Sequence, residues 1–438
     1  MALSNVTITD TDNNLAVGGT TSTQKISGLL FDIGKQSTFW TAGAGLAAKS
    51  KLFGKVIEVN KMSDLTDLGI TKYTGVSTAD LMFGIPYYHI AHFFAKQGDT
   101  GRLFIAFADC TSNWDIIDQM QRTAERKINQ LGIYTEQPLW SITDDTATTY
   151  NLNLVGDLQT KALAMQTDNA PLSILLSANS AVVKTSATDQ KTVDLTKIPT
   201  CIKAARFVSV LLGQSHDDTV AAMQLANTNC TPIGTVGAAV GCCADASVEE
   251  SIACVRDFEL SAQFPSIEMG FGDMTIDATT GKFTSTLLYS SLNSAQLDAL
   301  EDKGYIFLCQ YAGLEGNVYF TKDRTCSSDD YRTIARNRTI NKSRRAVRVA
   351  LLPYINSPLL VDPTTGYLSS AKITVFKNIV TDILSTMKAN GEISGYTVTI
   401  SSTQNVIQTD TLQIDYTIVP LGEAENIAVT EGLSLTGA

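Results

Sequence analysis

Short apolar runs alternate with segments of helical periodicity over much of the chain. The run GKVIEVN at 54–60 leads into a helical pattern near 62–68. A longer helical pattern over about 78–97 precedes the apolar run RLFIAFA at 102–108. Apolar positions at helical spacing predict helices, and apolar runs bounded by polar residues predict strands. We therefore expect the order strand, helix, helix, strand.

Three further runs are apolar with little alternation: PLSILLSA at 171–178, RFVSVLLG at 206–213 and YIFLCQY at 305–311. Strands of this kind are covered on both faces, as in parallel sheets. With helices between them, they predict an α/β fold with a mostly parallel, doubly wound sheet over residues 25–325.

A further helix is predicted after Ser112, because Asp115 follows three residues later as in a capping box. Apolar residues then recur at helical spacing, and Gly132 is expected to end the helix. These apolar positions are Ile116, Ile117, Met120, Ala124, Ile128 and Leu131.

The last hundred or so residues have a different pattern. Ser369 or Ser370 can cap a helix over about 371–389, which Asn390-Gly391 would stop. The segments 396–400 and 412–418 then alternate apolar and polar positions, which predicts a hairpin of half-buried antiparallel strands. We expect a C-terminal α+β domain over 326–422. In the second strand one face would carry Leu412, Ile414, Tyr416 and Ile418.

Both ends of the chain are expected to be arms, over 1–24 and 423–438. Each contains one short alternation and no period that would bury a face. Element boundaries are hardest to place at about 140–200 and 260–295, where a surface subdomain could be inserted. The alternations are Val6, Thr7, Ile8 and Thr9 in the first arm and Ile427, Ala428, Val429 and Thr430 in the second.

A lone strand of four residues buries too little surface to hold itself and needs a sheet to join. The hairpin edges at 396–418 could accept such a strand from another copy. About four backbone hydrogen bonds per arm, at roughly 0.5 to 1.5 kcal/mol each, would contribute a few kcal/mol. The alternative is that the arms are disordered or fold back on their own domain.

Composition limits the possible partners. The net charge of −11 opposes nucleic acid, and no apolar run is long enough to span a membrane. The N-terminus resembles no signal peptide, so we expect a cytoplasmic protein. The eight cysteines are not grouped as CxxC pairs and are expected to be reduced core thiols.

Seven basic side chains lie within 332–348. They favour salt bridges to neighbouring subunits, with a solvated helix face as the main alternative and nucleic-acid binding as a weaker one, since aromatic platforms are absent beyond Tyr331. We assign the inter-subunit salt bridges to Arg332, Arg336, Arg344 and Arg345.

Other motifs indicate structure more than chemistry. GTVGAAVG at 234–241 lacks the GxGxxG spacing and favours close helix packing. His89 and His92 have no further histidine or cysteine at ligand spacing, which favours a buried or interfacial role over a metal site. We expect no catalytic residue, cofactor or metal.

Four segments resemble one protein family: GYIFLCQYAGLEGNVYF, YRTIARNRTINKSRRAVRVALLPYINSP, TGYLSSAKITVFKNIVTDILSTMKANGEISGY and TLQIDYTIVPLGEAENIAVT. They resemble the contractile tail sheath proteins of phages and contractile injection particles, in good register over about 300–430 and more loosely over 80–260. The resemblance implies hexameric rings stacked helically around an inner tube, assembled in a bacterial cytoplasm. It also implies baseplate and tail terminator proteins as partners.

By the same resemblance, Val6 to Thr9 and Ile427 to Thr430 would be strands exchanged with neighbours. The helix at 371–389 or its flanks would contact the tube, where Lys372, Lys377 and Lys388 could meet acidic groups; the alternative is that these lysines lie on a solvated face. Contraction would be a rigid-body rearrangement that needs no nucleotide. The competing hypotheses are a soluble α/β enzyme or nucleotide-binding protein with a crevice at the sheet, or another self-assembling tail component.

Overall fold

The computed structural model describes most of the chain between residues 25 and 433. The described residues are 25–34, 49, 51–74, 78–97, 102–135, 137, 139, 141–142, 148–149, 153–178, 184–186, 189–190, 199–214, 233–265, 274–276, 283–285, 288–314, 316–425, 427–431 and 433. Of the predicted arms, Val6 to Thr9 lie outside these residues.

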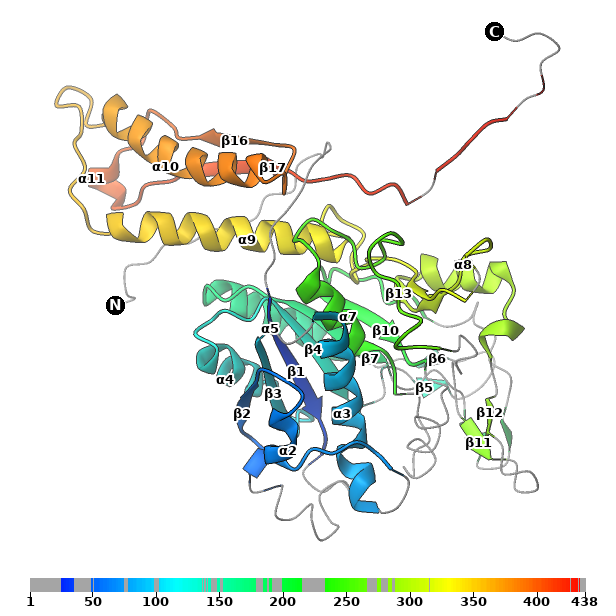
Figure 1. Ribbon diagram of the computed structural model, residues 1–438. Helices are drawn as coiled ribbons and strands as arrows, with labels where there is room; N and C mark the ends of the chain where they lie inside the picture. Colours follow the sequence, from blue (N-terminus) through cyan, green and yellow to red (C-terminus); the bar gives the residue numbers. More distant parts are fainter. Residues whose placement is uncertain are drawn as a thin grey trace.

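A seven-stranded sheet forms the centre of the larger body (Figure 1). Its strand order is β13-β10-β7-β4-β1-β3-β2, and every neighbouring pair is parallel except β2 with β3. The expected mostly parallel sheet is confirmed. The strands are β1 (Ile26–Asp32), β2 (Val56–Val59), β3 (Arg102–Ala108), β4 (Gln130–Thr135), β7 (Ser173–Ala178), β10 (Val208–Leu212) and β13 (Tyr305–Ile306).

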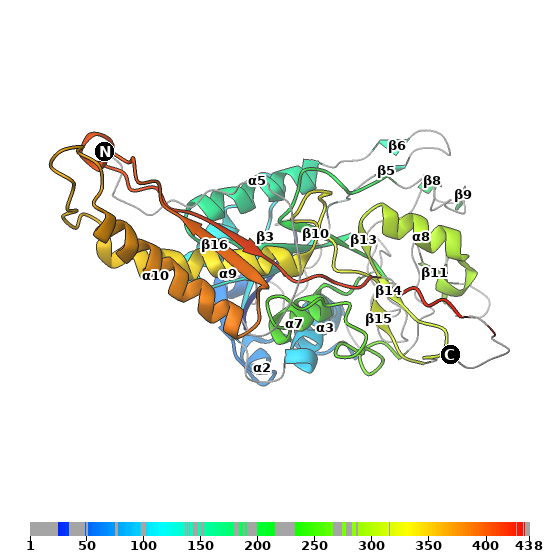
Figure 2. The same ribbon diagram turned by 90° about the horizontal axis from the view of Figure 1, so that it is seen from above.

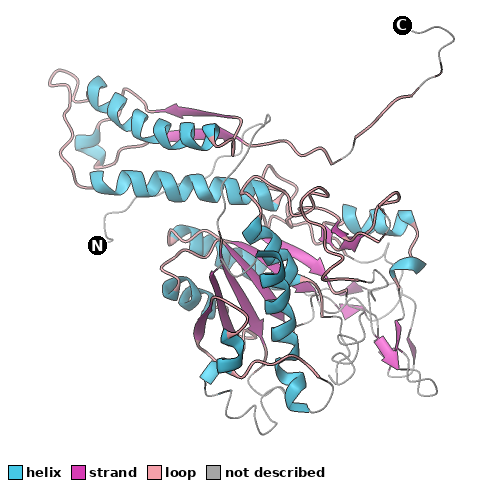
Figure 3. Ribbon diagram, viewed as in Figure 1, coloured by secondary structure: helices cyan, strands magenta, loops and turns pink. Residues whose placement is uncertain are grey.

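Helices cover both faces of this sheet, because alternate residues of its strands enter two separate cores. In β3, Ile105 and Phe107 belong to the core under α3 and α7, whereas Phe104 and Ala106 belong to the core under α4, α5 and α8. Figure 3 shows the helices on either side of the strands. The helices of this body are α2 (Asp64–Leu68), α3 (Thr78–Gln97), α4 (Ile116–Thr123), α5 (Asn153–Thr167), α7 (Val236–Asp245), η4 (Tyr289–Ser291) and α8 (Ser294–Asp302).

Small residues bring α7 close to α3, as the segment GTVGAAVG predicts. A Cβ atom on Gly237 would lie 2.1 Å from the carbonyl oxygen of His89. A Cβ atom on Gly241 would lie 2.8 Å from the carbonyl oxygen of Phe93. Both distances are far inside van der Waals contact, so these positions require glycine.

The helix predicted to run from Ser112 to Gly132 is wrong in its second half. α4 ends at Thr123, and β4 begins at Gln130. The turn between them uses Glu125 and Arg126 at positive φ, 53° and 63°. Leu131 therefore lies in a strand, and the N-cap residue is Asp115 without a side-chain cap. Apolar spacing that fits a helix can continue by chance into a buried strand.

The run YIFLCQY forms two short strands in different sheets instead of one. β13 pairs with β10, whereas β14 (Leu308–Cys309) pairs with β15 (Tyr319–Phe320) in an antiparallel pair. Three more two-stranded pairs lie in the regions where an inserted subdomain is a prediction. They are β5 (Ser141–Ile142) with β6 (Thr148–Thr149), β8 (Lys184–Ser186) with β9 (Asp189–Gln190), and β11 (Met274–Ile276) with β12 (Phe283–Ser285).

A C-terminal lobe lies above the sheet body in Figure 1, and Figure 2 shows from above that α10 reaches past the edge of that body. Its own core, which includes Val347, Val380 and Leu384, is separate from the two cores of the body. We use the term C-terminal lobe for residues 334–419. Its elements are α9 (Ile334–Leu351), η5 (Leu352–Tyr354), α10 (Ser370–Ala389), β16 (Gly395–Thr399), α11 (Val406–Thr409) and β17 (Asp415–Val419).

The predicted amphipathic helix is confirmed as α10. The Ser369 hydroxyl accepts a hydrogen bond from the Lys372 amide at 3.4 Å, and Gly391 follows the helix at φ 69°. Phe376 and Val380 are buried on its apolar stripe. Within the described residues, no helix is long and apolar enough to cross a bilayer.

Candidate assembly surfaces

The antiparallel hairpin predicted near the C-terminus is confirmed. β16 and β17 pair in register from Gly395 with Val419 to Thr399 with Asp415. Ile414, Tyr416 and Ile418 pack against the core of the lobe, although the strand begins only at Asp415. Leu412 and Ile414 thus precede the strand but keep the predicted alternation of partly buried and exposed positions.

This sheet contains only β16 and β17 among the residues that the structure describes. Each strand is therefore paired along one side, and its outer edge offers backbone donors and acceptors to a further strand. The pair lies on α10, so one face is covered and the edges are the parts open to addition.

The C-terminal arm leaves the lobe after β17 and extends away from the molecule (Figure 1). Ile427 and Val429 are each 83% exposed, and Leu433 is fully exposed. Exposed apolar side chains close together in sequence are a feature of segments that bind other proteins. The predicted exchange strand of this arm is thus placed where another molecule can reach it.

The three lysines predicted to meet the tube lie on α10. Lys377 and Lys388 are exposed, and Lys372 is partly buried in the first turn. By helical spacing, Lys377 and Lys388 lie on one flank of the buried stripe of Phe376, Val380, Leu384 and Met387, and Lys372 lies on the opposite flank.

Two arginines of the basic segment tie α9 to the sheet body, which the sequence did not indicate. The buried Arg338 guanidinium donates to the carbonyl oxygens of Cys243, Ala246 and Ser247 at the end of α7. These bonds satisfy carbonyls that a helix terminus leaves open.

Arg345 connects α9 to the sheet body in the same way, about two helical turns after Arg338. Its guanidinium donates to the carbonyl oxygens of Arg126 at 2.7 Å and Ile128 at 2.9 Å, and also to that of Pro171. Burial lowers the pKa of Arg345 to about 10. These carbonyls lie just before β4 and β7, so Arg345 fixes α9 across the ends of two strands.

The other basic residues of α9 also have partners within the chain. The Lys342 ammonium lies 2.7 Å from the Glu392 carboxylate, which is fully buried after α10. Arg344 donates to the Asn341 side chain at 3.2 Å, and Arg336 donates to the Asp330 carbonyl oxygen at 3.3 Å. Ion pairs of Arg332, Arg336, Arg344 and Arg345 with neighbouring subunits stay predictions.

Apolar side chains are also exposed where α9 ends and α10 begins. Sequence periodicity missed this surface because it lies on a loop and on the outer sides of two helices. Apolar surface outside the core is typical of protein interfaces. The residues are Val349, Leu352, Tyr354, Leu360, Tyr367 and Val375.

His89 and His92 lie on α3 in an aromatic environment. The Gly237 amide donates to His89 Nδ1 at 3.4 Å, and the His92 ring contacts Tyr88 and Phe264. Burial and the neighbouring His92 lower the pKa of His89 to about 3, and burial lowers the pKa of His92 to about 4. The predicted buried role is confirmed for His89, which is fully buried.

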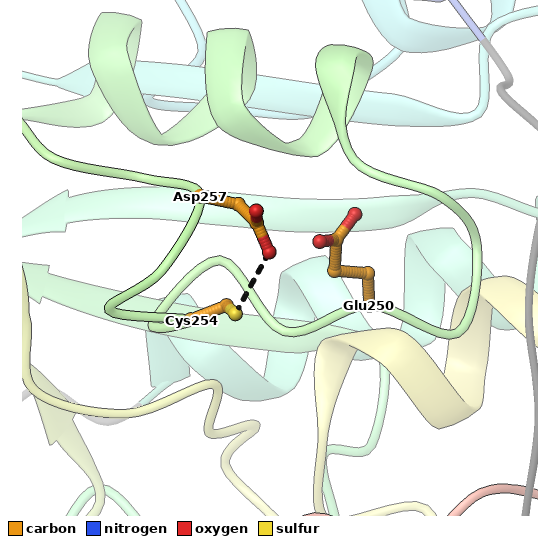
Figure 4. A group of neighbouring side chains, drawn as sticks. All are labelled: Glu250, Cys254 and Asp257. Atoms are coloured by element: carbon orange, nitrogen blue, oxygen red, sulfur yellow. Dashed lines mark hydrogen bonds between the residues drawn. The ribbon is translucent and has the colours of Figure 1, made fainter.

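One group of side chains has the composition of a metal site (Figure 4). Potential ligand atoms of Glu250, Cys254 and Asp257 lie within 4.8 Å of one another. However, the Cys254 thiol donates to Asp257 at 3.1 Å, and the Arg256 guanidinium donates to the same carboxylate at 2.8 Å. Burial raises the pKa of the thiol, so the proton needed for this bond is retained. The group is a hydrogen-bonded turn whose ligand atoms are already used.

The described cysteines have the expected character. Seven are free thiols, and all of these except Cys254 are buried. Burial raises the pKa of Cys243 and Cys309 to about 12. Such thiols are poor nucleophiles. Cys230 and His216 lie outside the described residues.

Comparison with known families gives two matches that together span most of the chain. The family described as DUF2586, N-terminal domain, matches residues 33–324. The family described as DUF2586, C-terminal domain, matches residues 330–438. A comparison with curated proteins gave no match.

Solved structures show the same fold over nearly the whole chain. One is the helical sheath of the anti-feeding prophage in its contracted state, with a TM-score of 0.56, 13% identity, and coverage of 99% of this chain and 100% of that one. Another, from the baseplate of the anti-feeding prophage, gives the same values. The PVC sheath complex of an extracellular contractile injection system, in its contracted state, has a TM-score of 0.55 and 13% identity, covering 99% and 98%. The predicted resemblance to contractile sheath proteins is confirmed at the level of the fold.

Proposed function

The chain belongs to the DUF2586 family, and from that premise and its fold we propose that it is the structural subunit of a contractile tail sheath. A fold alone does not specify a function. The proposal therefore depends on what this chain adds to the fold: an exposed apolar arm and a hairpin with open edges.

In strand addition the arm would be the donor strand, and the hairpin would be the acceptor. An extended segment with Ile427 and Val429 on one side can pair along the outer edge of β16 or β17 of another copy. Because the donor and acceptor are different surfaces, the contact is heterologous and links copies into rings or helices. Stacked hexameric rings around an inner tail tube are the arrangement that we infer. The segment Val6 to Thr9 would add a second exchanged strand.

Contraction would follow from the same linkage. The body, 25–325, and the sheath domain, 326–422, would move together while the arms, 1–24 and 423–438, keep neighbours tethered. Each strand contributes only a few kcal/mol, by the estimate of roughly 0.5 to 1.5 kcal/mol per backbone bond. Many weak links of this kind permit rotation without loss of the polymer, and the motion would drive the tube through a cell envelope.

The proposed partners follow from this role. They are other copies, an inner tube protein facing Lys372, Lys377 and Lys388, and baseplate and tail terminator proteins. The particle would be assembled in the cytoplasm of a bacterial host. The role is structural, without a catalytic site, cofactor or metal.

Electron microscopy of the purified protein tests the proposal. The intact chain should form hollow striated cylinders in a long and a short state. The double variant Ile427→Ser/Val429→Ser should form none, because it removes the apolar side of the arm. The matched control Ala428→Ser/Thr430→Ala changes the other side and should still form cylinders.

Deletion of residues 1–12 tests the N-terminal arm in the same assay. Loss of cylinders would support exchange through both arms. A small particle of uniform size from the intact chain would exclude the sheath subunit and favour a soluble α/β enzyme. Cylinders of one fixed length would indicate another self-assembling tail component.

A further inference from the structure

The first residues of the C-terminal arm are held against the sheet body by charged contacts. We use the term arm root for residues 421–425. The Glu425 carboxylate lies 3.3 Å from the Lys322 ammonium and 3.7 Å from the Arg324 guanidinium. Lys322 also pairs with Glu301 of α8 at 2.6 Å. The arm root is thus connected to the sheet body of its own chain.

These ion pairs are better shielded than ordinary surface pairs. The side chains of Lys322, Arg324 and Glu425 are 21%, 20% and 28% exposed. Partial burial weakens screening by solvent and salt. Burial alone would raise the pKa of Glu425, but Lys322 and Arg324 lower it below its usual value.

Glu423, two residues earlier in the arm root, is partly buried. Burial raises the pKa of Glu423, and the positive charge of Arg336 in the first turn of α9 opposes this rise.

Glu425 lies two residues before the exposed Ile427. Anchoring the Glu425 carboxylate on Lys322 and Arg324 therefore fixes the point at which the apolar arm leaves the sheet body.

We infer that Glu425, held by Lys322 and Arg324 of the same chain, is a positioning residue that aims the apolar arm at its acceptor. This inference rests on the proposed strand exchange for its purpose, but the contact itself is a property of one subunit. An aimed arm loses less conformational freedom on binding than a free one, which favours association.

Proteolysis with a glutamate-specific protease tests the contact without assembly. Both samples carry Ile427→Ser/Val429→Ser, so that subunits stay separate. Cleavage after the exposed Glu431 should be fast, and cleavage after Glu425 should be at least about tenfold slower because that segment is held. Adding Lys322→Ala/Arg324→Ala should raise the rate after Glu425 by about fivefold, as expected for two pairs of about 0.5 kcal/mol.

The control is Lys127→Ala, which removes an exposed pair with Glu125 elsewhere on the body and should leave the rate unchanged. Arg324→Ala alone serves as a milder variant if the double variant unfolds, and should give a smaller increase. Equal rates after Glu425 with and without the cations would overturn the inference.

Assembly of the full chain separates this inference from the proposed function. Glu425→Arg should reduce cylinder formation about tenfold, and adding Arg324→Glu should restore most of it by reversing the pair. Protected Glu425 without cylinders in any variant would leave the anchor standing and remove the sheath function. Normal cylinders from Glu425→Arg would show that the arm needs no aiming.

Discussion

At Gly237, the distance between two helices is set by the lack of a side chain. The site where its Cβ atom would lie is occupied by the backbone of His89 on α3, which cannot move aside as a side chain could. A residue of this kind is fixed by packing alone, independently of any binding role.

Gly237→Ala should therefore lower the free energy of unfolding by about 3 kcal/mol, because α3 and α7 must separate. Urea denaturation measures the change. The matched control is Gly156→Ala in α5, where nothing lies within 4 Å of the new methyl group. It should gain about 0.5 to 1 kcal/mol from the lower entropy of the unfolded chain. Similar losses in both variants would contradict the packing argument.

His89 makes stability depend on pH. Its pKa is about 3 in the folded protein and 6.5 in an unfolded chain, so between these values the unfolded state binds more protons. Stability must then fall as pH decreases from 7, by about 2 kcal/mol at pH 5 from this residue. Protonation of Nδ1 would also place a proton against the amide of Gly237.

His89→Phe keeps a ring and removes the titration. The difference in unfolding free energy between pH 7 and pH 5 should be about 2 kcal/mol smaller in the variant than in the parent. Chemical denaturation at both pH values checks this. Parallel pH profiles would show that His89 accepts a proton in the folded state.

At the scale of elements, α9 contributes to two cores. Ile334 near its start belongs to a core of the sheet body, and Val347 near its end belongs to the core of the C-terminal lobe. Arg338 and Arg345 fasten it to the body between these points. One helix therefore makes the two parts a connected fold.

Replacing Arg338 tests this connection. Arg338→Met fills similar space but removes the guanidinium donor from the carbonyl groups of Cys243 and Ala246, whereas the Ser247 carbonyl keeps the Glu250 amide. We expect a loss of about 2 kcal/mol in unfolding free energy, since each unsatisfied group costs about 1 kcal/mol or more. Arg256→Met, at an exposed ion pair, should leave the unfolding free energy almost unchanged. A near-neutral Arg338→Met would mean that α9 needs no such tie.

Periodicity predicted those elements whose environment is uniform along their length. α10 has one buried stripe and clear caps, and its limits match the prediction within a residue or two. The helix after Ser112 failed because the spacing of Ile128 and Leu131 fits helix and buried strand equally. The positive φ angles of Glu125 and Arg126 make the turn that separates the helix from the strand. Neither residue type predicts that conformation.

At the scale of the whole molecule, sequence could predict which surfaces are available but not what they contact. Alternation placed Ile414 and Tyr416 on the covered side of the hairpin and left Ile427 and Val429 without a partner. The contact of Glu425 with Lys322 joins positions about a hundred residues apart in sequence, where no local period carries information. The same is true of Arg345 with the carbonyl groups before β4 and β7.

The shared helix α9 also has a mechanical consequence. A pull on the C-terminal lobe enters the sheet body along a continuous row of helical hydrogen bonds, since no flexible linker lies between the two cores. The buried guanidinium contacts of Arg338 and Arg345 spread this force over the end of α7 and the ends of two strands. A force applied to the lobe should therefore move the lobe and the body together, without bending between them.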